Sequence, residues 1–154
     1  MAAESNIYLP RLLSRLRADE PFAPSMRDEL KLLREEIREN ICLLLNSRSR
    51  PEKDDLQNDA QLYYSVLGMG LSDVCGCTHS AMRIEAIKKE IKEQIVHFEP
   101  RLDPASVAVS LKRERGRQSE LELYISATIN LPEIQEQMEM AFTLDLETGI
   151  PSLV

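Results

Sequence analysis

The chain has 154 residues, which is typical of one domain that buries roughly two-thirds of the surface its unfolded form exposes. Hydrophobic residues make up 43% of it and charged residues 29%, a balance that excludes a disordered or fibrous chain. The formal net charge of -7 disfavours nucleic acid as a partner, because neutralising phosphates requires a basic surface.

The first segment, residues 1–24, is predicted to be an arm that precedes a domain formed by residues 25–154. The arm carries a short amphipathic stretch of leucines and arginines that ends at Pro21 and Pro24. Its start lacks the pattern of a secretory signal, and no apolar run in the chain approaches the roughly 18 residues that cross a bilayer. We therefore expect a cytoplasmic protein that does not insert into a membrane.

A long helix is predicted to follow the capping signal at Ser25 and Asp28. Apolar residues recur there at steps of three and four and form one stripe. The stripe consists of Met26, Leu30, Leu33, Ile37, Ile41 and Leu44. The remaining faces carry charged residues, among them Arg34 and Arg38, which we interpret as a solvated surface.

Residues 47–59 are rich in Ser, Arg, Pro, Asp and Asn and are predicted to form a loop. Two helical turns over residues 60–67 end where Gly68 and Gly70 break the segment. A second long helix follows a capping region at residues 78–80 and stops at Pro100. Its apolar stripe consists of Ile84, Ile87, Ile91 and Ile95, with Phe98 one step further.

Beyond Pro100 the hydrophobic period changes from about 3.6 to 2, which indicates strands. Residues 106–111 and 121–129 are predicted to pair as an antiparallel hairpin, and residues 138–147 to form a third strand. Residues 150–154 are a candidate edge or tail strand. A sheet with one apolar face needs a cover, which the two striped helices supply. We therefore predict an α+β fold with two layers, in which two long amphipathic helices pack on a small antiparallel β-sheet.

The candidate metal ligands are Cys75, Cys77 and His79, with His97 as a distant fourth. Structural zinc sites favour cysteine pairs separated by about two to four residues, and the step from Cys75 to Cys77 has no second pair. We interpret the segment as a thiol-bearing loop. This spacing leads us to expect no metal and no cofactor. A cysteine–histidine triad is rejected as well, because no elbow, orienting acid or oxyanion loop accompanies these residues.

The best candidate for a general acid is Glu99. Arg101 lies two residues further on, and a nearby guanidinium favours the ionised carboxylate, whereas a general acid must hold its proton. We therefore predict a structural ion pair between Glu99 and Arg101 and no catalytic residue.

The basic segment at residues 112–117 falls at the predicted hairpin turn. We interpret it as a solvated turn, with contact to an acidic protein surface as the alternative. No aromatic residues are interleaved in it to stack bases, so nucleic acid remains disfavoured.

Five stretches of the chain, taken together, resemble the TssE family, whose members are baseplate subunits of the bacterial type VI secretion system. They are residues 12–16, 43–48, 65–73, 98–102 and 142–149. The most diagnostic motif of the family matches Glu99-Pro100-Arg101. The chain departs from the family at Gly68-Met69-Gly70, where asparagine-tyrosine-glycine is usual, and at Ser72, where proline is usual. The family is similar to the sheath-initiating wedge protein of contractile phage tails and was long labelled lysozyme-like.

The resemblance implies a non-catalytic structural subunit of the baseplate at the cytoplasmic face of the inner membrane. It implies binding to other wedge subunits, of the TssF, TssG and TssK class, and initiation of the contractile sheath by β-strand exchange. The partner-binding residues expected on this basis are Glu99, Pro100, Arg101, Met138, Met140, Phe142, Thr143 and Leu144. Two alternatives remain open: a lysozyme-like peptidoglycan hydrolase and a generic cytoplasmic protein-interaction module.

Overall fold

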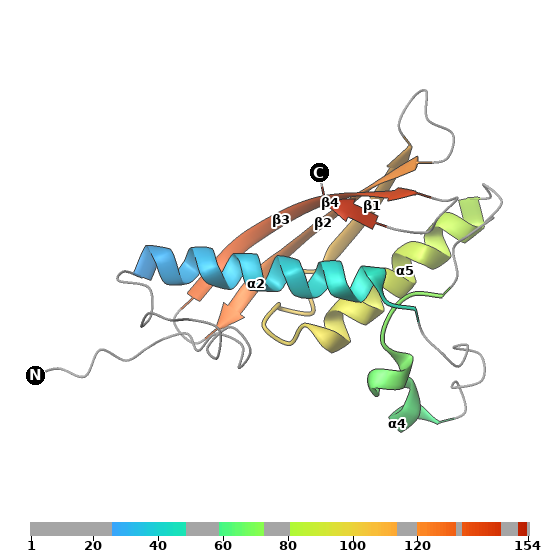
Figure 1. Cartoon of the computed structure of the whole chain (residues 1–154), viewed down its shortest axis with the longest axis horizontal. Helices are drawn as coiled ribbons and strands as arrows, with labels where there is room; N and C mark the ends of the chain where they lie inside the picture. Colours follow the sequence, from blue (N-terminus) through green and yellow to red (C-terminus); the bar gives the residue numbers. More distant parts are fainter. Residues whose placement is uncertain are drawn as a thin grey trace, which may run out of the picture.

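Two long helices cover one face of an antiparallel sheet and form the two layers of the fold (Figure 1). This confirms the predicted fold class. The computed structural model describes residues 26–48, 59–72, 81–113, 120–131, 134–145 and 151–153. The predicted arm at residues 1–24 lies outside the described residues, so its separation from the domain stays a proposal.

Helix α2 (Met26–Asn46) and helix α5 (Ala81–Phe98) bury the stripes that their sequences predict. In α2 the buried stripe residues are Leu33, Ile37, Ile41 and Leu44, and in α5 they are Ile87, Ile91 and Ile95. Residues at these steps lie on one side of a helix, so each helix presents a continuous apolar surface to the sheet. Neither of these helices, nor any other helix in the described ranges, combines the length and the apolar character needed to cross a bilayer.

The sheet has four strands in the order β1-β2-β3-β4, and all neighbouring strands are antiparallel. The strands are β1 (Ala108–Arg113), β2 (Glu120–Leu131), β3 (Ile134–Asp145) and β4 (Pro151–Leu153). Alternate side chains of β2 and β3 are buried, as the period of two predicts. Opposite partners such as Leu123 and Phe142 therefore meet in the core beneath the helices.

Strand β3 is not an edge strand along its whole length. Its second half pairs with β4 over Phe142–Leu144, which confirms the predicted C-terminal strand. Among the described residues, no strand pairs with the side of β3 that faces away from β2 over residues 134–141. We call this stretch the open edge of β3.

The segment between the helices forms helix α4 (Ala60–Tyr63) and a short 3-10 turn, η1 (Val66–Gly68), where two helical turns were predicted. Buried Gln94 of α5 holds its end: Gln94 Oε1 accepts from Gly70 N at 2.9 Å, and Nε2 donates to Gly68 O at 3.3 Å. Gly70 adopts a φ of 109°, and an added Cβ would lie 2.5 Å from Ser47 O. Gly70 thus lets this segment approach the residue that follows α2, while Gly68 approaches Tyr63 of α4.

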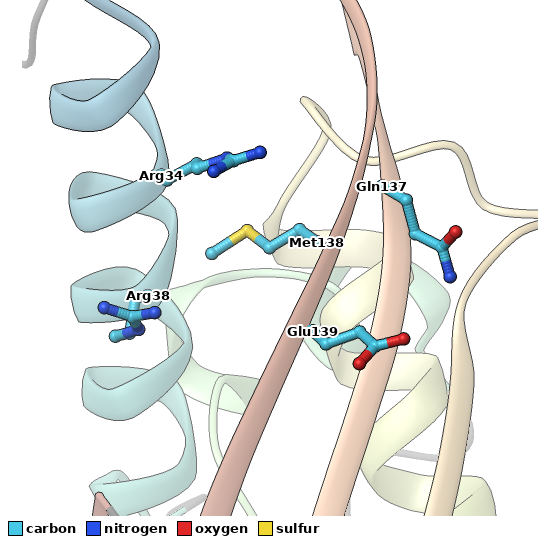
Figure 2. Close-up of a pocket in the computed structure, with 5 residues that line it drawn as sticks. All are labelled: Arg34, Arg38, Gln137, Met138 and Glu139. Atoms are coloured by element: carbon cyan, nitrogen blue, oxygen red, sulfur yellow. The ribbon is translucent and has the colours of Figure 1, made fainter. Parts of the chain in front are cut away.

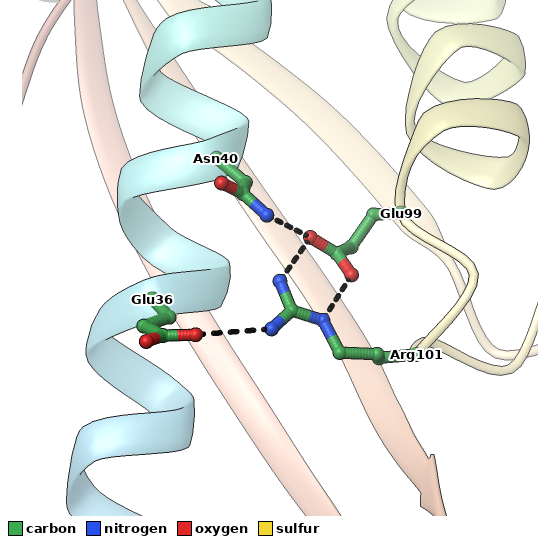
Figure 3. Close-up of polar contacts among 4 residues, drawn as sticks. All are labelled: Glu36, Asn40, Glu99 and Arg101. Carbon is green, nitrogen blue, oxygen red and sulfur yellow. Dashed lines mark hydrogen bonds and ion pairs between the residues drawn. The ribbon is translucent and has the colours of Figure 1, made fainter. Parts of the chain in front are cut away.

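The chain leaving α5 runs along β2 before β1 begins. Leu102 forms a bridge with Ile129, and Asn130 N donates to Arg101 O at 2.8 Å. This backbone contact places Arg101 beside the sheet, on the side covered by α2 (Figure 3).

Candidate functional site

The sheet residues expected to bind partners fall into two groups. Phe142, Thr143 and Leu144 are paired on both sides, by β2 and by β4, so their backbone is already part of the ladder. Met138 and Met140 lie on the open edge of β3, and their side chains are buried in the core. Addition of a partner strand therefore fits residues 134–141 of β3, and the buried Met138 and Met140 would take part in it through their backbone.

A shallow hollow lies along the open edge of β3 (Figure 2). Its lining consists of Arg34, Arg38, Gln137, Met138 and Glu139. Three of these are consecutive residues of one strand, whose side chains point alternately to the two faces of the sheet, so the hollow follows the strand's edge. Figure 2 shows Met138 directed toward α2 and Gln137 and Glu139 directed to the opposite side.

Arg34 joins the two layers at this hollow. Its guanidinium forms an ion pair with Glu136 of β3, although both side chains are partly exposed. Two buried atoms of the pair, Arg34 Nε and Glu136 Oε2, have no hydrogen-bond partner among the described residues. The contact was missed by the sequence interpretation, which assigned Arg34 to a solvated face. No local signal marks it, because the two residues are distant in sequence.

The second arrangement is a buried cluster of charges around Arg101 (Figure 3). Arg101 Nε donates to Glu99 Oε1 at 2.6 Å, and Nη2 donates to Glu99 Oε2 at 2.7 Å. From α2, Asn40 Nδ2 donates to Glu99 Oε2 at 3.0 Å, and Glu36 Oε2 lies 3.5 Å from Arg101 Nη1. We call these four residues the Arg101 cluster. It confirms the predicted ion pair between Glu99 and Arg101.

The Arg101 cluster is mostly internal. Glu99 is 2% exposed and Glu36 is 8% exposed, whereas Pro100 lies at the surface. Both carboxylate oxygens of Glu99 accept short hydrogen bonds from the Arg101 guanidinium, and one of them also accepts from Asn40. These contacts and its burial leave the carboxylate inaccessible to a substrate. The cluster links α2 to the chain that leaves α5, which positions the exposed turn at Pro100.

Of the four candidate metal ligands, the structure describes His97 alone. Cys75, Cys77 and His79 lie outside the described residues. His97 stacks on Tyr64, with ring centroids 4.4 Å apart, and donates from Nε2 to Tyr64 O at 3.0 Å. Of the basic segment 112–117, only residues 112 and 113 are described, and Lys112 lies over the ring of Tyr124.

The comparisons with known proteins give one sequence match and one structural match. The sequence profile of the family described as baseplate wedge protein gp25 matches residues 31–133, a range that includes the whole Arg101 cluster. No curated protein sequence matches the chain. A solved structure, that of a candidate tail lysozyme from Geobacter sulfurreducens, is 16% identical. That match covers 82% of this chain and 96% of the other, with a TM-score of 0.48.

Proposed function

The chain belongs to the baseplate wedge protein gp25 family, and from this premise we propose that it is a non-catalytic subunit of a type VI secretion baseplate that initiates the contractile sheath. In this proposal it binds wedge subunits of the TssF, TssG and TssK class at the cytoplasmic face of the inner membrane. The membership is carried by a profile match over more than half of the chain. The type VI assignment rests on the stretches that resemble TssE.

Strand exchange with the sheath is proposed to take place at the open edge of β3. The observation that supports it is the first two-thirds of β3, residues 134–141, which have no pairing partner on one side among the described residues. Unpaired backbone groups of a sheet edge bind an added strand through main-chain hydrogen bonds, and alternate side chains set its register. The buried face of β3 fixes that register, because a slip by one residue would turn every apolar side chain to water.

Wedge binding is proposed to use the turn at Glu99-Pro100-Arg101. Pro100 is exposed, and the Arg101 cluster holds the turn rigidly between α2 and β2. A non-catalytic role is supported by the burial and the hydrogen bonds of Glu99, the best candidate for a general acid. Its carboxylate is buried and engaged by Arg101 and Asn40, so a sugar bond has no access to it.

A C-terminal extension tests strand exchange directly. In the β3–β4 register, Leu153 pairs with Phe142, and each residue added after Val154 would step one position back along β3. An extension of about eight threonine and valine residues would therefore continue β4 over the open edge and occupy it within the same chain.

We expect cells that carry this extension to incorporate the protein into the baseplate but to extend no sheath. Imaging of a fluorescent sheath subunit reads out the second effect, and pull-down of wedge subunits reads out the first. A Gly-Ser extension of equal length, which has low strand propensity, is the matched control and should leave the sheath normal. Normal sheaths with both extensions would contradict strand exchange at this edge.

A further inference from the structure

The two sides of the open edge of β3 carry different charged groups. On the helix-facing side, Arg34 and Arg38 of successive α2 turns line the hollow, and Figure 2 shows Arg34 extended toward the strands. On the outer side lies Glu139, which is exposed and makes no hydrogen bond or ion pair with any described residue. A strand that enters this hollow therefore meets the Arg38 guanidinium and the Arg34–Glu136 ion pair on one face, and the Glu139 carboxylate on the other.

We propose that this edge selects its incoming strand by charge, accepting an acidic side chain on the helix-facing side and a basic side chain opposite Glu139. The inference rests on the strand addition proposed above and adds the chemistry of the segment that enters. Directly opposite residues of an antiparallel pair lie on the same face within about 5.5 Å, so a basic residue opposite Glu139 stabilises the pairing and an acidic one opposes it. On the helix-facing side, the incoming residue would meet the α2 arginines across the hollow.

The arginines can turn to an incoming carboxylate at little cost. Within the described ranges, Arg38 is bound only in an exposed ion pair with Glu35 at 3.2 Å, a kind of contact that contributes little to stability. Arg34 is held by Glu136, but its Nε and the second oxygen of that carboxylate are buried without partners among the described residues. Such unsatisfied groups make the present pairing costly, which favours exchange for a second carboxylate.

The β3–β4 register defines which residues of a C-terminal extension would lie opposite each residue of the open edge of β3. Continuing from Leu153 opposite Phe142, the second residue added after Val154 would lie opposite Glu139, and the third opposite Met138. The third residue would face α2 between Arg34 and Arg38, while the second would lie on the outer face. A complementary extension therefore has lysine second and glutamate third, and a reversed extension has glutamate second and lysine third.

The test compares these two extensions on the full chain, each otherwise of threonine and valine. The readouts are hydrogen exchange of the backbone amides of residues 134–141 and the melting temperature. We expect the complementary extension to protect these amides more strongly and to melt about 2 to 4 °C above the reversed one. Arg38→Glu should remove or invert that difference. Lys92→Glu, which makes the same charge change on the exposed surface of α5, should preserve it.

Two failures are distinguishable. Equal protection by both extensions, above that of a Gly-Ser extension, would overturn charge selection and leave strand addition intact. If neither extension protects residues 134–141 more than the Gly-Ser extension does, strand addition at this edge fails and the charge inference fails with it. Retention of the difference in Arg38→Glu would also overturn the proposed role of the α2 arginines.

Discussion

Replacing Arg101 with methionine tests the Arg101 cluster, because it removes the guanidinium and keeps most of the length of the side chain. That guanidinium contacts Glu99 at 2.6 and 2.7 Å and Glu36 at 3.5 Å. The two carboxylates are 2% and 8% exposed, so the variant leaves both in a nearly dry site without their cation. Removing one partner of a buried ion pair costs about 3–5 kcal/mol. The Arg101 side chain is 18% exposed, so we expect the lower end, about 3 kcal/mol.

Urea unfolding followed by circular dichroism measures this loss, and it corresponds to a fall in melting temperature of about 6–12 °C. Arg38→Met is the matched control, because its exposed pair with Glu35 should cost less than about 1 kcal/mol. The double variant Glu99→Leu/Arg101→Met should be more stable than Arg101→Met, since it no longer buries the Glu99 charge. A cost for Arg101→Met as small as that of Arg38→Met would refute the internal role of the cluster.

Further predictions concern the segment held by Gln94 and the absence of catalysis. In Gly68→Ala the new Cβ would lie 1.9 Å from Tyr63 O, so we expect faster hydrogen exchange over residues 60–70 with a smaller effect on global unfolding. Burial, and then the carboxylates of Glu93 and Glu90, raise the pKa of Tyr63 above 10.0. The unfolded chain ionises first, so the associated stability is complete below pH 10.0 and is lost as the pH rises through the folded-state pKa. Tyr63→Phe should reduce this alkaline loss in urea unfolding at successive pH values. Purified peptidoglycan should not clear in a turbidity assay, and clearing that disappears in Glu99→Gln would contradict the non-catalytic proposal.

The helices and strands of the fold were predictable because the apolar residues of each element recur with one dominant spacing along the sequence. The stripe ending in Ile41 and Leu44 predicts α2, and the alternation around Phe142 predicts β3, since burial on one side of an element imposes its own spacing. The ion pair between Glu99 and Arg101 was also predictable, because only one residue separates its partners.

The contacts between elements could not be predicted in the same way. The hydrophobic period of a sequence predicts on which side of a helix a residue lies. It does not predict how far along the sheet the helix is placed. That offset brings Arg34 to Glu136 and Asn40 to Glu99, and neither pair has a signature in the sequence. The pairing of β4 with Phe142–Leu144 of β3 depends on the same long-range arrangement.

Site-specific photo-crosslinking tests the central claim most directly. Gln137 is exposed on the open edge of β3, and Ser110 is exposed on β1 at the other side of the sheet. With a photoreactive residue at either position in cells that assemble sheaths, strand exchange at β3 predicts a crosslink to the sheath subunit from position 137 and none from position 110. A sheath crosslink from position 110 alone, with wedge binding intact in both variants, would contradict the account.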